Sequence, residues 1–182
     1  MINNENMKKF ILMLNGPMCA GKSTTGELLL NEIKNSFRVS SDKIKWLISN
    51  YSKDEHSELA YRLTLTLANS AFHEGLSLII DSNTYSAKLA ALNYKELAKS
   101  EKAKFLIVNI EAPIEVLTKR FKERLISAKE SNSKISVTTI ERMLEIYQKY
   151  IEDKDENNFT FDSSVLKPEE ICKKITELIN IE

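Results

Sequence analysis

The stretch LNGPMCAGKSTTG at residues 14–26 decides the fold of this chain. It contains the pattern G-x-x-x-x-G-K-[ST], in which Gly16 and Gly21 are the glycines and Lys22 and Ser23 follow directly. An apolar strand-like run precedes the pattern and a segment with helical spacing follows it, which is the context that a phosphate-binding loop needs. Backbone N–H groups of such a loop, with the N-terminus of the next helix, face phosphate oxygens. The sequence therefore predicts a phosphate site here rather than a surface turn.

Glycine is scarce in this chain, and its placement supports the same interpretation. Three of the four glycines lie within residues 16–26, and their entropic cost is justified only where the backbone needs their freedom. We expect Lys22 to reach the outer phosphates as a catalytic residue and Ser23 to hold a magnesium ion. The expected nucleotide-binding residues are Gly16, Pro17, Met18, Cys19, Ala20, Gly21, Lys22, Ser23 and Thr24.

Composition limits the classes of protein to which the chain can belong. Its 182 residues suffice for one sizeable core, so we expect a single domain over residues 1–182. The 26 acidic and 26 basic side chains balance, so no global field draws the chain to nucleic acid or anionic lipid. The apolar run at residues 10–14 is too short for a secretory signal, and no segment has the roughly 18 apolar residues of a membrane span. Two distant cysteines, Cys19 and Cys172, fit a reducing compartment, so we expect a cytoplasmic protein without a membrane partner.

Strand-like and helical segments alternate along the chain. Five strand-like runs are separated by segments in which apolar residues recur with helical spacing, such as Leu59, Leu63 and Leu67. This alternation predicts an α/β fold in three layers, a five-stranded parallel sheet with helices on both faces. The expected strands are residues 8–15, 37–41, 76–81, 103–112 and 158–162. The expected helices are residues 23–35, 42–50, 54–74, 87–100, 113–127, 140–151 and 167–180.

A carboxylate ends the second strand-like run, FRVSSD. In a parallel sheet this edge is where ligands bind, so Asp42 can act as general base and take the proton of an acceptor hydroxyl. Lys45, one helical turn later, can bind the acceptor or pair with Asp42. The alternative is structural, because Asp42 or Ser41 could equally be a helix N-cap. Trp46 is expected to pack in the core rather than stack on a base.

A second carboxylate ends the third strand-like run. Asp81 closes the apolar sequence LSLII, and Asn83 follows two residues later. A carboxylate at this edge of the sheet can approach a bound magnesium ion or the acceptor. We therefore expect Asp81 to bind magnesium or the acceptor and Asn83 to bind the acceptor, with a solvated turn as the alternative.

Two arginines precede a polar, irregular segment at residues 127–137. Arg120 and Arg124 lie four residues apart and share one helical face. On a mobile lid they could close over a transferring phosphoryl group and neutralise its charge. The alternative is an ordinary solvated face of a helix. The phosphate-binding loop favours the lid, which we expect at about residues 119–139.

These motifs together resemble a known family. GPMCAGKSTT, SSDKIK, DSN, RFKER and the closing FDSS resemble the P-loop kinases grouped around the 5′-hydroxyl polynucleotide kinase domain, with zeta toxins and chloramphenicol phosphotransferase as wider relatives. The resemblance implies a nucleoside-monophosphate-kinase-like fold with a helical lid and ATP with Mg²⁺ as donor. It also implies Asp42 as general base and Arg124, helped by Arg120, on the transferred phosphoryl group. The chain has Lys45 where the polynucleotide kinases have arginine, and arginine suits a substrate phosphate better.

The expected function is that of an ATP-dependent kinase acting on a hydroxyl, with a nucleotide or nucleic-acid 5′-hydroxyl as acceptor. A kinase of small molecules, such as a sugar or an antibiotic, would use the same residues. A non-catalytic nucleotide-binding regulator is the alternative outside enzymes. Basic residues between Glu115 and Lys134 suit a short anionic acceptor, such as a nucleotide or a short single strand, better than a long duplex. They are Lys119, Arg120, Lys122, Arg124, Lys129 and Lys134, against Glu115, Glu123 and Glu130.

Overall fold

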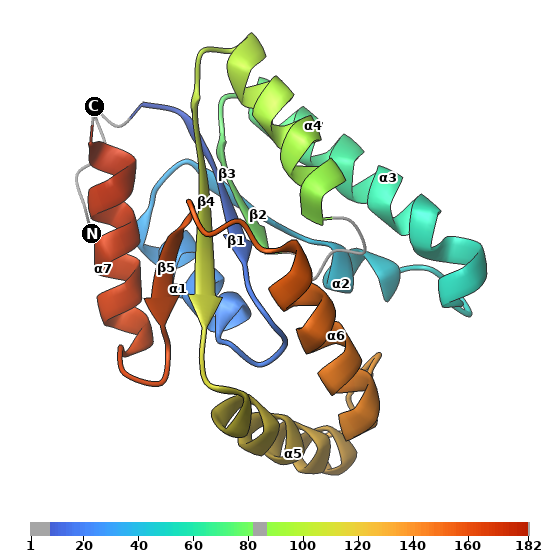
Figure 1. The fold of residues 1–182 in the computed structure, drawn as a ribbon. Helices are drawn as coiled ribbons and strands as arrows, with labels where there is room; N and C mark the ends of the chain where they lie inside the picture. The colour runs from blue at the N-terminus through green and yellow to red at the C-terminus, as the bar shows by residue number, and fades with distance from the viewer. Residues whose placement is uncertain (1–7, 82–86, 182) are drawn as a thin grey trace.

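The computed structural model describes residues 8–81 and 87–181 of the chain. Its centre is a five-stranded sheet in the order β2-β3-β1-β4-β5, and every pair of neighbouring strands is parallel (Figure 1). The strands are β1 (Phe10–Asn15), β2 (Ser36–Ser40), β3 (Ser77–Asp81), β4 (Lys104–Glu111) and β5 (Phe159–Asp162). The predicted parallel sheet is therefore confirmed, with each strand close to its expected place.

Helices cover both faces of the sheet, as parallel strands require. The helices are α1 (Lys22–Glu32), α2 (Ser41–Lys45), α3 (Lys53–His73), α4 (Ala87–Ser100), α5 (Ile114–Glu130), α6 (Ile140–Asp153) and α7 (Pro168–Asn180). Figure 1 shows α1 and α7 against one face and α3 and α4 against the other, while α5 and α6 lie beyond the carboxyl ends of the strands. This is the predicted three-layer arrangement.

Each face of the sheet has its own apolar core. Strand residues alternate between the two faces, so Leu12 and Leu14 pack with α1 and α7 while Ile11 and Met13 pack with α3 and α4. The central strands β1 and β3 are almost fully buried, and for that reason they appear in the sequence as continuous apolar runs, whereas the edge strand β5 is mostly exposed.

The structure corrects two details of the helices expected from periodicity. The helix expected at residues 42–50 is shorter in the structure, where α2 ends at Lys45. Leu47 is 81% exposed, so no buried apolar face continues the helix beyond that point. In α3 the leucines at 59, 63 and 67 are 38–44% exposed, and the helix buries the neighbouring face of Ala60, Thr64, Ala68 and Phe72. The spacing of the leucines therefore predicted the helix correctly, but the buried face is a different one.

The segment between α5 and α6 is shorter than expected. Helix α5 continues to Glu130, so the irregular connection covers residues 131–139 rather than 127–137. Helix α6 is capped by Thr139, whose hydroxyl accepts the backbone N–H of Arg142 at 3.3 Å. None of the helices in the described part of the chain is long and apolar enough to cross a membrane.

The register of the strands brings the site together. Leu14 of β1 pairs with Asp81 of β3, and Asp81 pairs in turn with Ser40 of β2. The three strands therefore end at one level, and the segments that follow β1 and β2 begin beside Asp81. In parallel sheets this carboxyl edge is the usual place for ligands.

Candidate active site

The loop after β1 has the backbone geometry that its glycines predicted. Gly16 has φ +139°, and a Cβ built on it would lie 2.0 Å from the carbonyl oxygen of Ile110 in β4. No side chain fits there, so the loop can leave the sheet only with glycine at this position. Gly21 has φ +101° and is the N-cap of α1, and Cys19 also has a positive φ of 64°. The loop thus leads directly into the N-terminus of α1, where backbone N–H groups attract phosphate oxygens.

Lys22 folds back into this loop. Its Nζ donates to the carbonyl oxygens of Gly16 and Pro17, both at 2.8 Å, and only 4% of the residue is exposed. Burial lowers the pKa of Lys22 from 10.5 to about 8, although the negative charges of Asp81 and Asp42 act in the opposite direction. Because burial separates the ammonium of Lys22 from water, a negatively charged phosphate bound in the loop would stabilise it.

The charged groups that shift the pKa of Lys22 are among the residues predicted for the site. Asp81 and Asp42 raise the pKa of Lys22, and Arg124 lowers it by repulsion. The register of the strands agrees with this, because Asp81 at the end of β3 pairs with Leu14 just before the loop and with Ser40 just before α2. The predicted residues Lys22, Asp42, Asp81 and Arg124 thus share one region, while Asn83 lies outside the described residues.

Asp42 lies in the first turn of α2 and is held by Lys45. The helix has Ser40 as its N-cap, so neither Asp42 nor Ser41 has the capping role that the sequence left open. Lys45 Nζ donates to Asp42 Oδ1 at 2.5 Å and to the hydroxyl of Ser136 at 2.5 Å. Ser136 belongs to the connection between α5 and α6, so Lys45 joins the candidate base to the expected lid.

Asp81 has a buried partner that the sequence did not reveal. Arg38 of β2 donates from Nη2 to Asp81 Oδ2 at 2.5 Å and from Nη1 to Glu27 of α1 at 2.9 Å. The side chains of Arg38 and Asp81 are 5% and 6% exposed, so this is a buried ion pair. A Cβ on Gly26 would lie 2.9 Å from Arg38 Nε, which shows that this glycine leaves room for the guanidinium. The only sign of this ion pair in the sequence was the charge of Arg38 inside the strand-like run FRVSS.

The residues expected to hold magnesium have suitable chemistry. Ser23 is exposed in the first turn of α1, and Asp81 stands at the end of the neighbouring strand. A hydroxyl and a carboxylate are hard oxygen donors, and Mg²⁺ in phosphate sites needs only one or two protein ligands because phosphates and waters complete its shell. In residues 8–81 and 87–181 no group of three or more His, Cys, Asp or Glu side chains could hold a metal by itself. The donor set therefore fits a magnesium ion that arrives with a nucleotide.

The two predicted arginines have different surroundings. Arg120 donates to the hydroxyl of Ser163 at 2.9 Å and to its carbonyl oxygen at 2.7 Å, with a longer contact of 3.4 Å to the carbonyl oxygen of Cys19. It ties α5 to the loop after β5 and to the phosphate-binding loop. Arg124, one turn later, is exposed and lies on the side of Lys22. A contact of Arg124, helped by Arg120, with a bound phosphoryl group stays a prediction.

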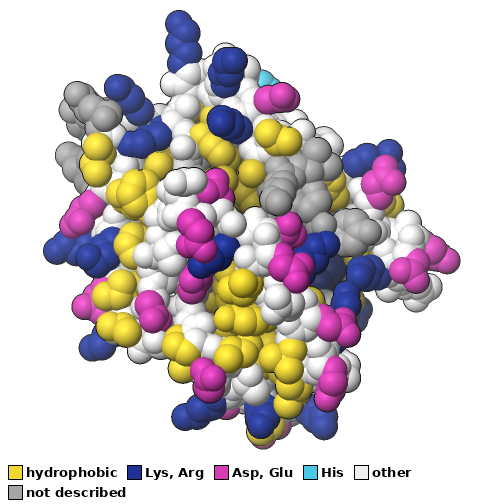
Figure 2. All heavy atoms as spheres, in the orientation of Figure 1, with side chains coloured by type: hydrophobic (Ala, Val, Ile, Leu, Met, Phe, Trp, Pro, Cys, Tyr) yellow, Lys and Arg dark blue, Asp and Glu magenta, His cyan; other side chains and the backbone are white. Residues whose placement is uncertain are grey.

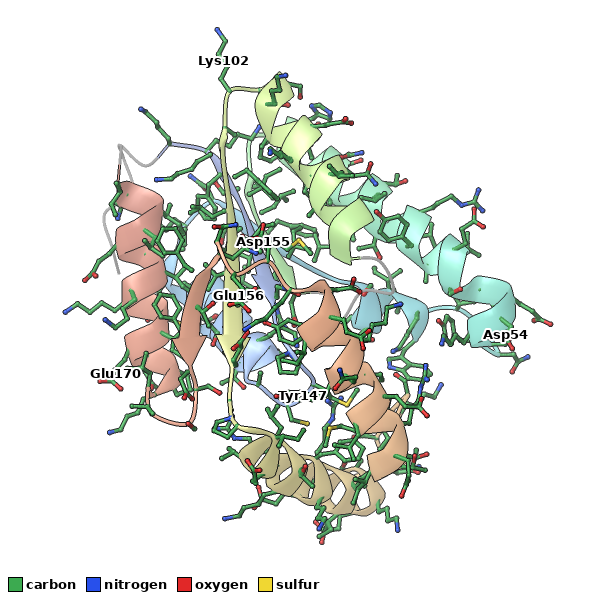
Figure 3. All side chains as sticks on the ribbon, in the orientation of Figure 1. Asp54, Lys102, Tyr147, Asp155, Glu156 and Glu170 are labelled. Atoms are coloured by element: carbon green, nitrogen blue, oxygen red, sulfur yellow. The ribbon has the colours of Figure 1, made fainter. Side chains whose placement is uncertain are left out.

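A hollow in the surface lies away from these residues. Apolar and acidic side chains of α6, with Ile114 of α5, line a shallow groove that includes Leu144 and Tyr147. Figure 2 shows apolar side chains in this lower central area, and Figure 3 shows Tyr147 between α6 and the strands. The groove contains none of the predicted site residues, so we place the candidate site at the carboxyl edge of the sheet.

Together, the strand order, the glycine-bearing loop and the buried lysine define a P-loop NTPase fold of the kind found in kinases. The family model described as AAA domain matches residues 11–150, so the chain belongs to this family. A comparison with curated protein sequences gave no match.

Solved structures of kinases and related proteins share the fold. The tunicamycin resistance protein of Deinococcus radiodurans is 17% identical, with 96% of this chain and 98% of that chain covered and a TM-score of 0.61. The APS kinase CysC of Mycobacterium tuberculosis, solved with AMPPNP and APS, is 12% identical, with 96% and 99% covered and a TM-score of 0.64. A chain of the Pnkp1/Rnl/Hen1 RNA repair complex is 22% identical, with a TM-score of 0.60, and 84% of this chain covers 48% of that chain. At these identities the likeness establishes the fold alone.

Proposed function

We propose that the protein is an ATP-dependent kinase that transfers the γ-phosphoryl group to an acceptor hydroxyl. The observation that carries this proposal is the register of the strands, which puts Asp81 and the start of α2, with Asp42, beside a loop that holds phosphates in proteins of this fold. A protein that only binds nucleotide needs the loop and the lysine. A carboxylate next to them on α2, held by Lys45, suits the transfer of a proton.

Each residue has a distinct role in this proposal. The loop N–H groups and Lys22 bind the phosphates. Ser23 and Asp81 would hold Mg²⁺, which would supply positive charge to the polyphosphate. Asp42 accepts the proton of the acceptor hydroxyl while the new P–O bond forms and the bond to the departing ADP breaks. Lys45 orients the Asp42 carboxylate through its hydrogen bond. Arg124 neutralises charge on the transferred group.

We further propose a nucleotide or a nucleic-acid 5′-hydroxyl as the acceptor. Lysine and arginine side chains are exposed along α5 and the connection to α6, among them Lys122, Arg124, Lys129 and Lys134. Figure 2 shows basic side chains along the lower edge of the molecule, where α5 lies. Such a patch attracts a short anionic ligand. Two of the similar structures support the same class of acceptor. One is a chain of an RNA repair complex, and the other is an APS kinase that binds a nucleotide.

The variant Asp42→Asn tests the kinase proposal. The amide keeps the shape of the side chain but cannot accept the proton, so kcat should fall roughly 10²- to 10⁴-fold while the Kd for ATP changes little. Asp54→Asn is the matched control, because Asp54 is an exposed carboxylate at the start of α3 on the edge of the molecule (Figure 3). Equal turnover of both variants per folded molecule would refute Asp42 as general base.

The acceptor is tested by a screen with radiolabelled ATP. The candidates are 5′-hydroxyl oligonucleotides, nucleosides, sugars and aminoglycoside-like antibiotics. Labelling of an oligonucleotide or nucleoside supports the proposed acceptor. The affinity for the acceptor should fall only weakly with salt concentration, because few phosphates are neutralised. Labelling of an uncharged sugar or antibiotic alone would make the protein a small-molecule kinase instead.

A further inference from the structure

Three aromatic rings stand in a row beside the candidate base. The Trp46 and Tyr51 rings meet edge to face with centroids 5.8 Å apart, and the Tyr51 and His56 rings are 6.0 Å apart at an interplanar angle of 35°. All three side chains are half-buried, and neither core cluster in the described part of the chain includes them. The expectation that Trp46 packs in the core is therefore wrong, and these rings form an aromatic row at the surface.

The aromatic row adjoins Asp42. Trp46 follows α2 four residues after Asp42, and its φ and ψ of −78° and −6° continue the helical path, so the two side chains emerge on one side of the turn. Tyr51 packs edge to face against Trp46, and the pKa of Tyr51 is raised by burial and by the negative charge of Asp42. A molecule that presents a hydroxyl to Asp42 would thus have the rings of Trp46 and Tyr51 within its reach.

Two lysines flank the Trp46 ring. Lys45 Nζ lies 5.0 Å from the ring centroid and Lys134 Nζ lies 5.8 Å from it, both within cation–π distance. Lys134 is exposed and comes from the connection between α5 and α6, which also supplies Ser136 to Lys45. The flexible ammonium of Lys134 can leave the ring at little cost, because an exposed cation–π contact contributes only about 0.5–1 kcal/mol. Aromatic faces with adjacent cations bind molecules that carry a planar ring and a negative charge.

We propose that Trp46 and Tyr51 form a ring-binding subsite for the acceptor, with the exposed Lys134 as the partner of its negative charge. The acceptor is then a hydroxyl compound that carries a planar aromatic ring and an anionic group, as a nucleotide or short single strand does. The subsite holds the ring by stacking, which tolerates different bases, and leaves the hydroxyl to Asp42. This inference rests on the proposed function, since it concerns the acceptor of the same reaction.

Trp46 is itself the probe, because it is the only tryptophan of the chain. The ATP site is first saturated with a non-hydrolysable ATP analogue. The protein is then titrated with thymidylyl-(3′→5′)-thymidine, a dinucleotide with a free 5′-hydroxyl, and with 2-deoxyribose 5-phosphate as the anionic control without a base. Tryptophan emission should change saturably with the dinucleotide and should not respond to the sugar phosphate. An unchanged emission with a dinucleotide that the enzyme phosphorylates would overturn the subsite and leave the kinase proposal standing.

Kinetics provide a second measurement. Replacing Tyr51 by leucine keeps an apolar side chain but removes the aromatic face, so the KM for the dinucleotide should rise roughly 5- to 150-fold while kcat stays within about twofold. Phe159→Leu is the matched control, since Phe159 is a half-exposed aromatic residue on β5. Equal KM values for Tyr51→Leu and Phe159→Leu would overturn the subsite. A saturable change in emission without any phosphoryl transfer would support the subsite and refute the kinase.

Discussion

The buried ammonium of Lys22 should make the nucleotide-free protein less stable than it would be without this lysine. The pKa of Lys22 falls from 10.5 to about 8 because its ammonium is buried, and this difference corresponds to about 3 kcal/mol of unfolding free energy at pH 7. Lys22→Met removes the charge but leaves the carbonyl oxygens of Gly16 and Pro17 without their donor, at about 1 kcal/mol each. The variant should therefore be about 1–2 kcal/mol more stable at pH 7, although it loses phosphoryl transfer.

The sign of the pH dependence follows from the same pKa. Between pH 8 and 10.5 the unfolded chain keeps a proton on Lys22 that the folded protein has released, so the wild-type protein gains stability as the pH rises. Below pH 8 both states are protonated and the full cost is present. The difference in unfolding free energy between Lys22→Met and the wild-type protein should therefore decrease by about 2 kcal/mol between pH 7 and pH 9.5.

Urea unfolding without nucleotide at pH 7 and pH 9.5 measures both effects. Comparing the variant with the wild-type protein at each pH removes the contribution of other groups that titrate in the same range. Lys95→Met, at an exposed lysine of α4, is the control and should match the wild-type protein at both pH values. A Lys22→Met protein that is less stable than the wild type by the same amount at both pH values would refute the reasoning.

Two further predictions concern positions that the fold constrains. Gly16→Ala should cost at least about 2 kcal/mol of unfolding free energy, because its Cβ would lie 2.0 Å from the carbonyl oxygen of Ile110; Gly75→Ala, with positive φ but open space, should cost less in the same urea titration. Arg38→Met should cost about 3–5 kcal/mol because it leaves the Asp81 carboxylate buried without its ion-pair partner. Combining it with Asp81→Asn should restore part of that loss, and a double variant as unstable as the sum of the two single ones would show that they do not interact.

The sequence predicted the parts of the site that depend on neighbours along the chain. The loop at residues 16–23 was recognisable because positive φ values and a close approach to β4 demand glycine at fixed places. The alternation of buried strands and helices predicted the parallel sheet, since both faces of such strands are apolar. Asp42 and Asp81 were found because the carboxyl ends of parallel strands meet at one edge, although their catalytic and metal-binding roles stay predictions.

What the sequence missed depends on contacts between residues far apart in the chain. Arg38 lies 43 residues from Asp81, and Ser136 lies 91 residues from Lys45, and no local pattern marks either pair. The aromatic row likewise needed the tertiary structure, because helical spacing near Trp46 suggested a buried face that the sheet does not cover.

The sequence by itself determined the class of fold and the position of the phosphate-binding loop, because backbone geometry and alternation of strands and helices are local properties. The tertiary structure alone decided which helix faces are buried, with α3 placing its leucines outward, and which groups hold each candidate residue in place. It decided these because burial and ion pairing depend on the packing of segments distant in sequence. The surroundings of Asp42, and with them the ring-binding subsite that we propose, follow from the contacts of Lys134 and Ser136 with Trp46 and Lys45.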